Sequence, residues 1–323
     1  MPALRACLAT ACLTVVTLVL LPLQWLAVRY AWPIRRTIPV IFHRAACGLL
    51  GVRVSERGRI GAQRPLLLTS NHSSWLDILV LGSRVPLSFV AKSEVASWPL
   101  FGTFARLQRS VFVDRQRRSA TGRTMSEIAE RLTNGDAMVL FAEGTSSDAA
   151  SVLPFRTALI GAAQAALSGG AVKTDSGAGT VWVQPLAIIY THLQGLPLNR
   201  RTRPLIAWYG DMDLAPHLWR LLKEGAVDVE LVWGEPVAVA PGTDRKTLAR
   251  ALEETVRTAV TDTLLGNRER IAEAEPEPRA ESRAGPLAGP LAGPLAGSGL
   301  EAGREATSGA ENADEEQNVA ASQ

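Results

Sequence analysis

The sequence is short of cysteine. Only three of its 323 residues are cysteines, Cys7, Cys12 and Cys47, and all three lie near the N-terminus. No C-x-x-C pair occurs, so neither a disulfide framework nor a zinc site with that spacing is expected. We expect these cysteines to be small apolar filler. Nothing in the sequence therefore requires an oxidising compartment or a metal ion.

Two further features that the sequence lacks argue against nucleic-acid binding and against a serine lipid hydrolase. Aromatic residues make up only 6% of the chain, and no basic run is interleaved with them, which argues against nucleic acid as a partner. No G-x-S-x-G motif occurs, so the nucleophile elbow of serine lipid hydrolases is missing. What is present is 47% hydrophobic residues and a mean hydropathy of +0.09. These values indicate a folded domain with a limited apolar attachment.

The net charge of +3 conceals two segments of opposite sign. From Asn267 to Gln323 five arginines stand against eleven acidic residues, a charge of −6, and three tandem copies of Ala-Gly-Pro-Leu begin at Ala284. Frequent proline and glycine oppose helix and strand, so residues 266–323 are expected to form a disordered low-complexity tail. The residues before Asn267 carry +9, which favours an anionic membrane surface as a partner.

The segment from Cys7 to Val28 carries no charge and is long enough to span a hydrocarbon core of about 30 Å. We interpret residues 1–36 as a membrane anchor, with a cleaved signal peptide and a buried or interfacial hairpin helix as alternatives. Arginines are more numerous after this segment than before it. The positive-inside rule therefore predicts an inner (cytoplasmic) membrane protein whose main domain faces the cytoplasm. A second apolar stretch, Ile38–Val52, is either an amphipathic helix on the bilayer or the first packed helix of the domain.

Strand-like and helix-like segments alternate between residues 37 and 265, which predicts one layered α/β domain. The expected strands are 65–70, 87–91, 109–114, 137–141, 181–190, 204–208 and 227–233. The expected helices are 75–82, with Ser73 or Ser74 as its cap, 121–133, 216–224 and 246–265.

A histidine follows the first of these strands, in the string Asn71-His72-Ser73-Ser74-Trp75-Leu76-Asp77. On a continuous helix the side chains of His72 and Asp77 would point about 140° apart. They can meet only if His72 lies in the turn and Asp77 lies in the first helical turn, folded back to the imidazole. A carboxylate on one ring nitrogen fixes the tautomer and leaves the other nitrogen free as a base.

Three more strings lie in or directly after expected strands. Phe141–Ser146 follows strand 137–141, so we expect it to open onto the same sheet edge as His72. Val111–Arg115 places an Asp-Arg pair at another strand end, and Val183–Leu186 lies within a strand-like segment. Each string alone is consistent with an ordinary strand or turn. Together, and in this order, they point to one site.

With these four strings the sequence resembles the 1-acylglycerol-3-phosphate acyltransferases, a family of bacterial glycerolipid acyltransferases, over roughly residues 40–240. The family motif N-H-x-x-x-x-D matches Asn71, His72 and Asp77, which implies that His72 and Asp77 are catalytic. The resemblance also implies a glycerolipid acyltransferase-like layered α/β fold. It implies that Arg115, Glu143, Gly144 and Thr145 bind the acceptor, and we add Ser146 and Arg156 as further candidate substrate-binding residues.

Two positions depart from the family's usual F-P-E-G-T-R-S motif. Ala142 replaces the proline, and Ser146 replaces an arginine whose guanidinium is suited to binding phosphate. Either Arg115, Arg109 or Arg156 then binds the phosphate, or the acceptor has no glycerol phosphate.

Neighbouring strings bear on that choice of acceptor. Glu143–Asp148, Pro154–Thr157 and Trp208–Met212 look like the branch that contains the lyso-ornithine-lipid acyltransferases.

The resemblance implies transfer of an acyl chain from acyl-CoA or acyl carrier protein to the hydroxyl of a lysolipid. The main expectation is 1-acyl-sn-glycerol 3-phosphate as acceptor, giving phosphatidate, and the alternative is lyso-ornithine lipid or another lysolipid. No metal or other cofactor is expected. Because the nucleophile elbow is missing, direct transfer assisted by His72 is favoured over an acyl-enzyme. Rival interpretations are a non-catalytic lysolipid-binding membrane protein and a lipid hydrolase.

Overall fold

The computed structural model describes residues 1–113, 127–128, 130–132, 134–157, 160–161, 181–240 and 242–266. These residues belong to one compact unit, Met1–Glu275. The expected tail from residue 267 onward and most of the expected helix 121–133 lie outside the described residues. Both expectations therefore stay predictions.

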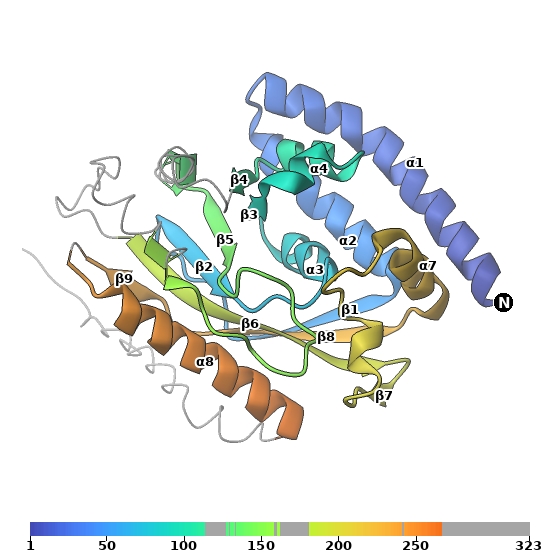
Figure 1. Ribbon diagram of the computed structural model, residues 1–323. Coiled ribbons are helices and arrows are strands. Elements are labelled where there is room, and N and C mark those ends of the chain that lie inside the picture. The colour runs from blue at the N-terminus through green and yellow to red at the C-terminus, as the bar shows by residue number, and fades with distance from the viewer. Residues whose placement is uncertain are drawn as a thin grey trace, which may run out of the picture. The chain divides into compact units, whose positions relative to one another are not determined.

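Nine strands of the described chain form one sheet in the order β1-β8-β6-β2-β5-β3-β4, and β7 and β9 pair with β6 (Figure 1). The strands are β1 Val52–Arg57, β2 Leu66–Ser70, β3 Ser88–Lys92, β4 Val111–Val113, β5 Ala137–Phe141, β6 Val181–Leu193, β7 Leu196–Pro197, β8 Val227–Trp233 and β9 Val237–Val239. The helices are α1 Pro2–Arg29, α2 Ile38–Leu50, α3 Leu76–Arg84, α4 Phe101–Leu107, α7 Leu214–Glu224 and α8 Arg245–Leu265. Short 3-10 turns are η1 Pro33–Arg36, η2 Ser93–Ser97 and η3 Arg203–Leu205.

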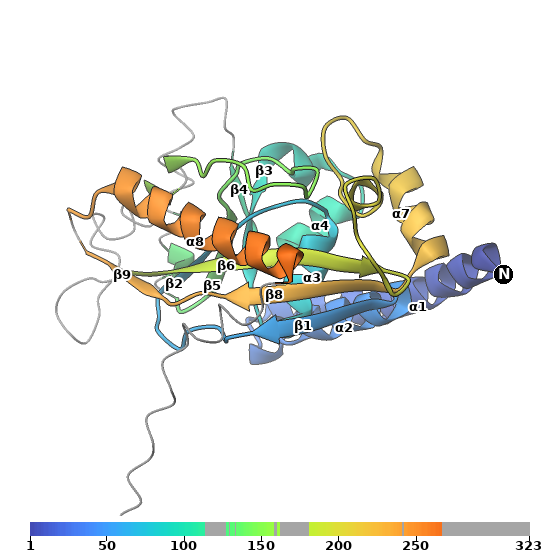
Figure 2. The same ribbon diagram turned by 90° about the horizontal axis from the view of Figure 1, so that it is seen from below.

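The centre of the sheet is parallel and sets the position of the site. β2 runs parallel to both β5 and β6, and β3 runs parallel to β5 and β4. The carboxyl ends of β2 and β5 therefore reach the same sheet edge, where Ser70 is paired with Phe141. In Figure 2, β1, β8 and β6 lie side by side, with β8 antiparallel to β6.

Helices cover both faces of the sheet, because its strands are apolar on both sides. Leu66 and Leu68 of β2 belong to a core with α1, α2, α3 and α7, whereas Leu67 belongs to the core under α8. Figure 1 shows α8 below the sheet and the other helices above it. The layered α/β fold expected from the sequence is confirmed.

One expected strand is wrong. Residues 203–205 form the η3 turn, and the amides of Ile206 and Ala207 bond back to the carbonyl of Arg203. The chain then runs along the turn after β2, where the N–H of Trp208 donates to the carbonyl of Ser73 at 2.8 Å. The apolar composition of residues 204–208 suggested a strand. The backbone hydrogen bonds of the turn and the contact of Trp208 with Ser73 give a turn in its place.

The second apolar stretch is a packed helix. His43, Cys47 and Leu50 of α2 are buried, and α2 packs against α3. Gly82 of α3 makes room for His43, since a Cβ at that position would lie 1.9 Å from His43 Nδ1. Burial lowers the pKa of His43 to about 4, so this imidazole is neutral at pH 7.

Helix α1 is attached to the domain near both of its ends. Near the N-terminus, the guanidinium of Arg5 donates to the carbonyls of Leu222 at 2.5 Å and Leu50 at 3.0 Å. Near the C-terminus, the buried amide of Gln24 donates to the carbonyls of Arg35 at 3.0 Å and Leu107 at 2.8 Å. One long face of α1 is therefore held against the protein.

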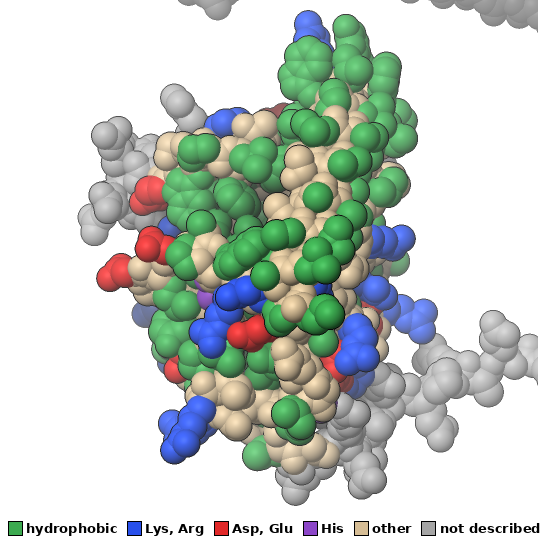
Figure 3. Space-filling view, turned by 90° about the vertical axis from the view of Figure 1, so that its right-hand side faces the viewer, with side chains coloured by type: hydrophobic (Ala, Val, Ile, Leu, Met, Phe, Trp, Pro, Cys, Tyr) green, Lys and Arg blue, Asp and Glu red, His purple; other side chains and the backbone are tan. Residues whose placement is uncertain are grey.

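The opposite face of α1 is apolar and exposed. Its exposed side chains include Leu4, Leu8, Val15, Leu18 and Trp25, each at least 58% exposed. Figure 3 shows hydrophobic side chains gathered over this helix, with basic side chains (Lys or Arg) near its edges. The helix is long and apolar enough to cross a membrane by length and composition. Its exposed face is thus suited to contact with lipid.

Candidate active site

His72 and Asp77 meet in the turn between β2 and α3. The Nδ1 atom of His72 lies 2.8 Å from Oδ2 of Asp77, with His72 in the turn and Asp77 in the first helical turn. This is the arrangement that the five-residue spacing predicts. Trp75 is the N-cap residue of α3, one or two positions after the expected Ser74 or Ser73. The Ser74 hydroxyl still accepts the N–H of Leu76 at 3.4 Å, and it donates to the carbonyl of Ile206 at 2.8 Å.

The carboxylate of Asp77 is fully buried, and both of its oxygens accept hydrogen bonds. Its Oδ2 atom accepts the backbone N–H of Ser73 at 2.8 Å and of Ser74 at 3.1 Å, in addition to its contact with His72. Its Oδ1 atom accepts the hydroxyl of Tyr190 at 2.6 Å. Hydrogen bonds to a charged acceptor are strong and directional, so they fix the orientation of this carboxylate.

Sequence reasoning missed Tyr190. The hydroxyl of this residue is kept protonated, because burial, and then the charge of Asp77, raise its pKa well above the usual value. The available signal was the alternation along β6, where Leu186, Ile188 and Tyr190 belong to the core beside α3. That pattern predicts which face of the sheet Tyr190 lies on, but not that its hydroxyl binds Asp77.

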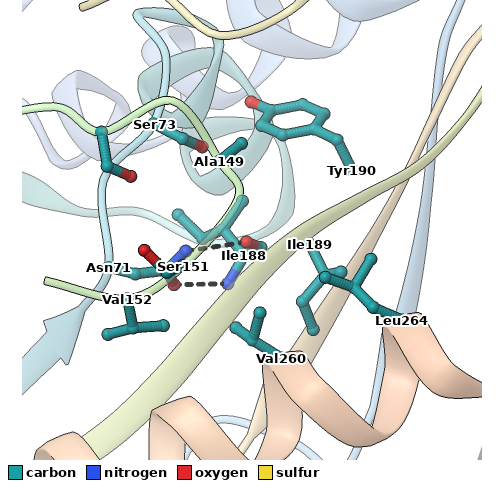
Figure 4. Close-up of a pocket in the computed structure, with 11 residues that line it drawn as sticks. Asn71, Ser73, Ala149, Ser151, Val152, Ile188, Ile189, Tyr190, Val260 and Leu264 are labelled. Carbon is teal, nitrogen blue, oxygen red and sulfur yellow. Dashed lines mark hydrogen bonds between the residues drawn. The ribbon is translucent and has the colours of Figure 1, made fainter. Parts of the chain in front are cut away.

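Asn71 ties the turn to β6. Its side-chain amide donates to the carbonyl of Ile188 at 2.9 Å, and its carbonyl oxygen accepts the N–H of Ile188 at 2.9 Å. Figure 4 shows both bonds, with Ser73 and Tyr190 lining the same pocket above β6 and α8. The side chain of Asn71 thus continues the hydrogen bonding between β2 and β6 one residue beyond the end of β2. The sheet therefore positions the turn that bears His72.

The imidazole of His72 lies against an aromatic ring. Its centroid is 4.0 Å from that of Phe141, with 17° between the planes, and Phe89 stacks on Phe141 in turn. The side chain of His72 is 19% exposed, and its Nε2 has no hydrogen-bond partner among the described residues. The ring is therefore oriented by contacts on one side and free to exchange a proton at Nε2.

The strand end of β5 joins the same site. The N–H of Ala142 donates to the carbonyl of Ser70 at 3.0 Å, and the N–H of Ser147 donates to the carbonyl of His72 at 2.9 Å. Between them, Gly144 adopts a φ of +76°, which glycine reaches without strain. The prediction that Phe141–Ser146 opens beside His72 is confirmed.

Glu143 is buried in this loop, with 2% of its surface exposed. Neither carboxyl oxygen has a hydrogen-bond partner in the described part of the chain. Burial raises the pKa of Glu143 to about 8, and the charge of Asp77 adds to the rise, while nearby backbone amides and Arg257 oppose it. Glu143 is therefore mostly protonated at pH 7 and able to donate a hydrogen bond.

The other predicted substrate-binding residues divide into three groups. Thr145 and Ser146 are half-buried in the same loop, and Arg156 lies beside it, its Nε donating to the carbonyl of Glu143 at 3.2 Å. Arg115 lies outside the described residues. Arg109 does not belong to the site: it precedes β4 and pairs with Asp136, which precedes β5, so it lies at the opposite sheet edge.

Comparison with known proteins gives consistent matches. Residues 51–189 match the family described as "Acyltransferase". The crystal structure of a 1-acyl-sn-glycerophosphate (LPA) acyltransferase from Thermotoga maritima aligns with a TM-score of 0.55 at 24% identity, covering 81% of this chain and 98% of that chain. This likeness shows a common fold.

Similar sequences include proteins named as acyltransferases of different lysolipids. Lyso-ornithine lipid O-acyltransferase from Brucella abortus (strain 2308) is 49% identical over 263 residues, covering 81% of this chain and 96% of the relative. A protein of the same name from Rhizobium meliloti (strain 1021) is 44% identical over 274 residues, covering 85% and 92%. A 1-acyl-sn-glycerol-3-phosphate acyltransferase from Neisseria gonorrhoeae is 30% identical over 209 residues, covering 64% and 74%.

Proposed function

The chain belongs to the acyltransferase family, and we propose that it transfers an acyl chain from a thioester donor to the hydroxyl of lyso-ornithine lipid. The main support is the degree of similarity to the two lyso-ornithine lipid O-acyltransferases, at 49% and 44% identity over nearly their whole length. The similarity to a 1-acyl-sn-glycerol-3-phosphate acyltransferase is lower, at 30%. Phosphatidate synthesis is thus the related second candidate.

The proposed mechanism uses His72 as the general base. Its Nε2 takes the proton from the acceptor hydroxyl while that oxygen attacks the thioester carbonyl. The new ester C–O bond forms, the C–S bond breaks, and the leaving thiolate receives the proton from His72. Asp77 holds Nδ1 and stabilises the positive charge that develops on the ring. The donor is proposed to be acyl-CoA or acyl carrier protein, and no further cofactor enters these steps.

The local chemistry supports an acceptor without a phosphate. Ser146 stands where the related phosphatidate-forming family usually has arginine, and a serine cannot supply the charge that a phosphate would require. Ornithine carries a carboxylate and an ammonium group instead of a phosphate. A site for such an acceptor needs a basic side chain for the carboxylate and an acidic side chain for the ammonium group.

A pair of opposite charges lies near the site. Arg203 of η3 lies close enough to Asp148 of the Glu143 loop for the two charges to interact, and the Nε of Arg203 is buried with no hydrogen-bond partner in the described chain. The segment bearing Arg203 is joined to the His72 turn through Ser74 and Trp208. We propose that Arg203 binds the ornithine carboxylate and that Asp148 binds the ammonium group.

An acceptor assay tests this proposal. Purified full-length enzyme in mixed micelles receives labelled acyl-CoA, with lyso-ornithine lipid or 1-acyl-sn-glycerol 3-phosphate as acceptor. We expect kcat/KM to be about tenfold or more higher for lyso-ornithine lipid, which corresponds to one charge-assisted contact of about 1.4 kcal/mol. A preference for 1-acyl-sn-glycerol 3-phosphate would refute the acceptor, and free fatty acid as the main product would indicate a hydrolase.

Substitution at Ser146 sharpens that assay. Ser146→Arg should raise kcat/KM for 1-acyl-sn-glycerol 3-phosphate relative to lyso-ornithine lipid, since it supplies a phosphate-binding guanidinium. Ser146→Gln is the matched control, with a longer side chain but no charge. If both substitutions change the ratio equally, side-chain size rather than charge decides the acceptor.

We further propose that α1 inserts into one leaflet of the inner membrane, on the cytoplasmic side, and does not cross it. Arg5 and Gln24 lie about 28 Å apart along the helix, yet both bind the same domain. A crossing helix would place these two attachments on opposite sides of the hydrocarbon core. The exposed apolar face of α1 can instead lie in the interface.

Thiol accessibility distinguishes the two arrangements. Cys47 is buried, so single reporters can be placed as Pro2→Cys and Lys246→Cys in a Cys7→Ser/Cys12→Ser background. In inverted inner-membrane vesicles, we expect both reporters to react with a membrane-impermeant maleimide. If Pro2→Cys reacts only in right-side-out vesicles, α1 crosses the membrane and the proposal is wrong.

A further inference from the structure

A second pocket, of about 240 Å³, lies at the end of the parallel strands opposite to His72. Its lining includes Leu87, directly before β3, and Asp136, directly before β5. Since His72 and Glu143 follow the carboxyl ends of β2 and β5, this pocket is separate from the candidate active site.

The pocket has an excess of positive charge. Its charged lining residues are Arg35, Arg36, Arg64, Arg109 and Asp136. Arg36 and Arg109 share the one carboxylate, each with a nitrogen 2.9 Å from an oxygen of Asp136. Four guanidinium groups against one carboxylate leave a net charge of +3 within the lining.

Two of these arginines have no acidic partner. Arg64 donates only to backbone carbonyls, those of Gly61 at 2.8 Å and Gln63 at 2.6 Å. The side chain of Arg35 makes no hydrogen bond or ion pair with any part of the chain that the structure describes, and the residue is half-buried. Unpaired guanidinium groups that converge on a pocket provide the donors that a phosphate accepts.

The electrostatics of the surrounding residues agree with this. Partial burial lowers the pKa of Arg64. Burial also lowers the pKa of Arg131, and the charge of Arg109 lowers it further, against the opposing charges of Asp136, Glu130 and Glu127. The fold therefore keeps several cations close together and partly out of water, an arrangement that an anion would stabilise.

The position of the pocket indicates where that anion comes from. Tyr30 and Trp32 stack at the end of α1, with centroids 5.8 Å apart, and are 60% and 45% exposed. Aromatic side chains of this type occupy the headgroup region of a bilayer. Arg35 and Arg36 follow three and four residues after Trp32, in the η1 turn, so they lie close to these rings along the chain. Apolar lining residues, among them Ile60 and Leu87, can contact the glycerol end of a lipid.

We propose that this pocket is a binding site for the phosphate of an anionic phospholipid headgroup, which holds this edge of the enzyme on the membrane. The ligand is a lipid of the bilayer and not the reacting acceptor. Arg35 and Arg64 bind the phosphate directly, and Arg36 and Arg109 add to the local potential while remaining paired with Asp136.

Vesicle binding by the full-length protein tests the proposal. The vesicles are phosphatidylcholine alone, phosphatidylcholine with phosphatidylglycerol, and phosphatidylcholine with cholesteryl hemisuccinate, which carries the same charge without a phosphate. The pocket variant is Arg35→Gln/Arg64→Gln, and the control is Arg245→Gln/Arg250→Gln on the exposed side of α8. If the double variant does not fold, Arg35→Gln alone is used as the pocket variant.

We expect wild type to bind the phosphatidylglycerol vesicles more tightly than the hemisuccinate vesicles. The pocket variant should lose about tenfold in affinity for phosphatidylglycerol vesicles, and Arg35→Gln alone should lose less, while the control keeps wild-type affinity. Equal losses in the pocket variant and the control would mean that general surface charge is responsible, and would overturn the proposal. Equal binding to both anionic vesicles would do the same.

A competition arm separates the two sources of phosphate. Inorganic phosphate is added at constant ionic strength to the phosphatidylglycerol vesicles. If the lipid is the ligand, millimolar phosphate leaves binding unchanged, because it lacks the contacts of the glycerol end and of the bilayer. Binding of labelled inorganic phosphate at micromolar concentration to wild type without vesicles, lost in the pocket variant, would show that the pocket prefers free phosphate and would refute the lipid assignment.

Discussion

His72→Ala is expected to lower kcat at least about 10³-fold with lyso-ornithine lipid and acyl-CoA, while KM changes little. General base catalysis contributes about 10²–10⁴-fold to a rate, and His72 is the base whose ring Asp77 orients. The measurement is single-turnover transfer of labelled acyl chains by protein reconstituted in micelles.

The fold of that variant should survive. His72 is partly exposed, and its replacement removes one ring contact with Phe141 and one bond to Asp77. Thermal unfolding and proteolysis check this. The matched control is His192→Ala, since His192 is 35% exposed in its side chain and lies outside the site near the end of β6. Turnover of His72→Ala within tenfold of wild type, in folded protein, would remove His72 from the mechanism.

Asp77→Asn is the substitution with the next largest expected effect, a loss of about 10²–10⁴-fold in kcat. The amide can still accept the bonds from Ser73, Ser74 and His72, so the turn should keep its geometry. What disappears is the buried negative charge that stabilises the imidazolium as the proton is transferred. The measurement is again kcat and KM separately, because a purely structural defect would lower the fraction of active enzyme and the thermal stability together.

Tyr190→Phe provides the comparison for Asp77. It removes the bond to Oδ1 but leaves the charge of Asp77 and the contact with His72 in place. We therefore expect a smaller loss in kcat, about tenfold, from the weaker orientation of the carboxylate. A loss in Tyr190→Phe as large as that in Asp77→Asn would mean that orientation, and not charge, is the contribution of Asp77.

Much of the site was predictable, because its main elements are local in sequence. The five-residue spacing of His72 and Asp77 requires a turn followed by a helix, and the apolar strand before it supplies that turn. The placement of Glu143 at the same edge follows from the parallel pairing of β2 with β5. In both cases, a short apolar run predicts the strand, and the polar residue after it predicts the edge.

Arg109 shows where this local reasoning fails. The expected strand 109–114 had Arg109 as its first residue, and the sequence offered it as one possible phosphate ligand of the acceptor. The direction of this strand was known from the sequence. The ion pair of Arg109 with Asp136, 27 residues away, could not be predicted from the local pattern. The structure assigns it to the other end of the sheet.

The sequence by itself determined that an apolar N-terminal helix precedes an α/β domain and that His72 and Asp77 form a pair, because helix periodicity and strand polarity act over a few residues. Only the tertiary structure decided the partners of that pair. Tyr190 reaches Asp77 across 113 residues, and Asn71 holds Ile188 across 117. The contacts of α1 with the domain are also distant in sequence, across 217 residues from Arg5 to Leu222 and 83 from Gln24 to Leu107. Such contacts depend on how the layers pack, and packing is a property of the whole chain.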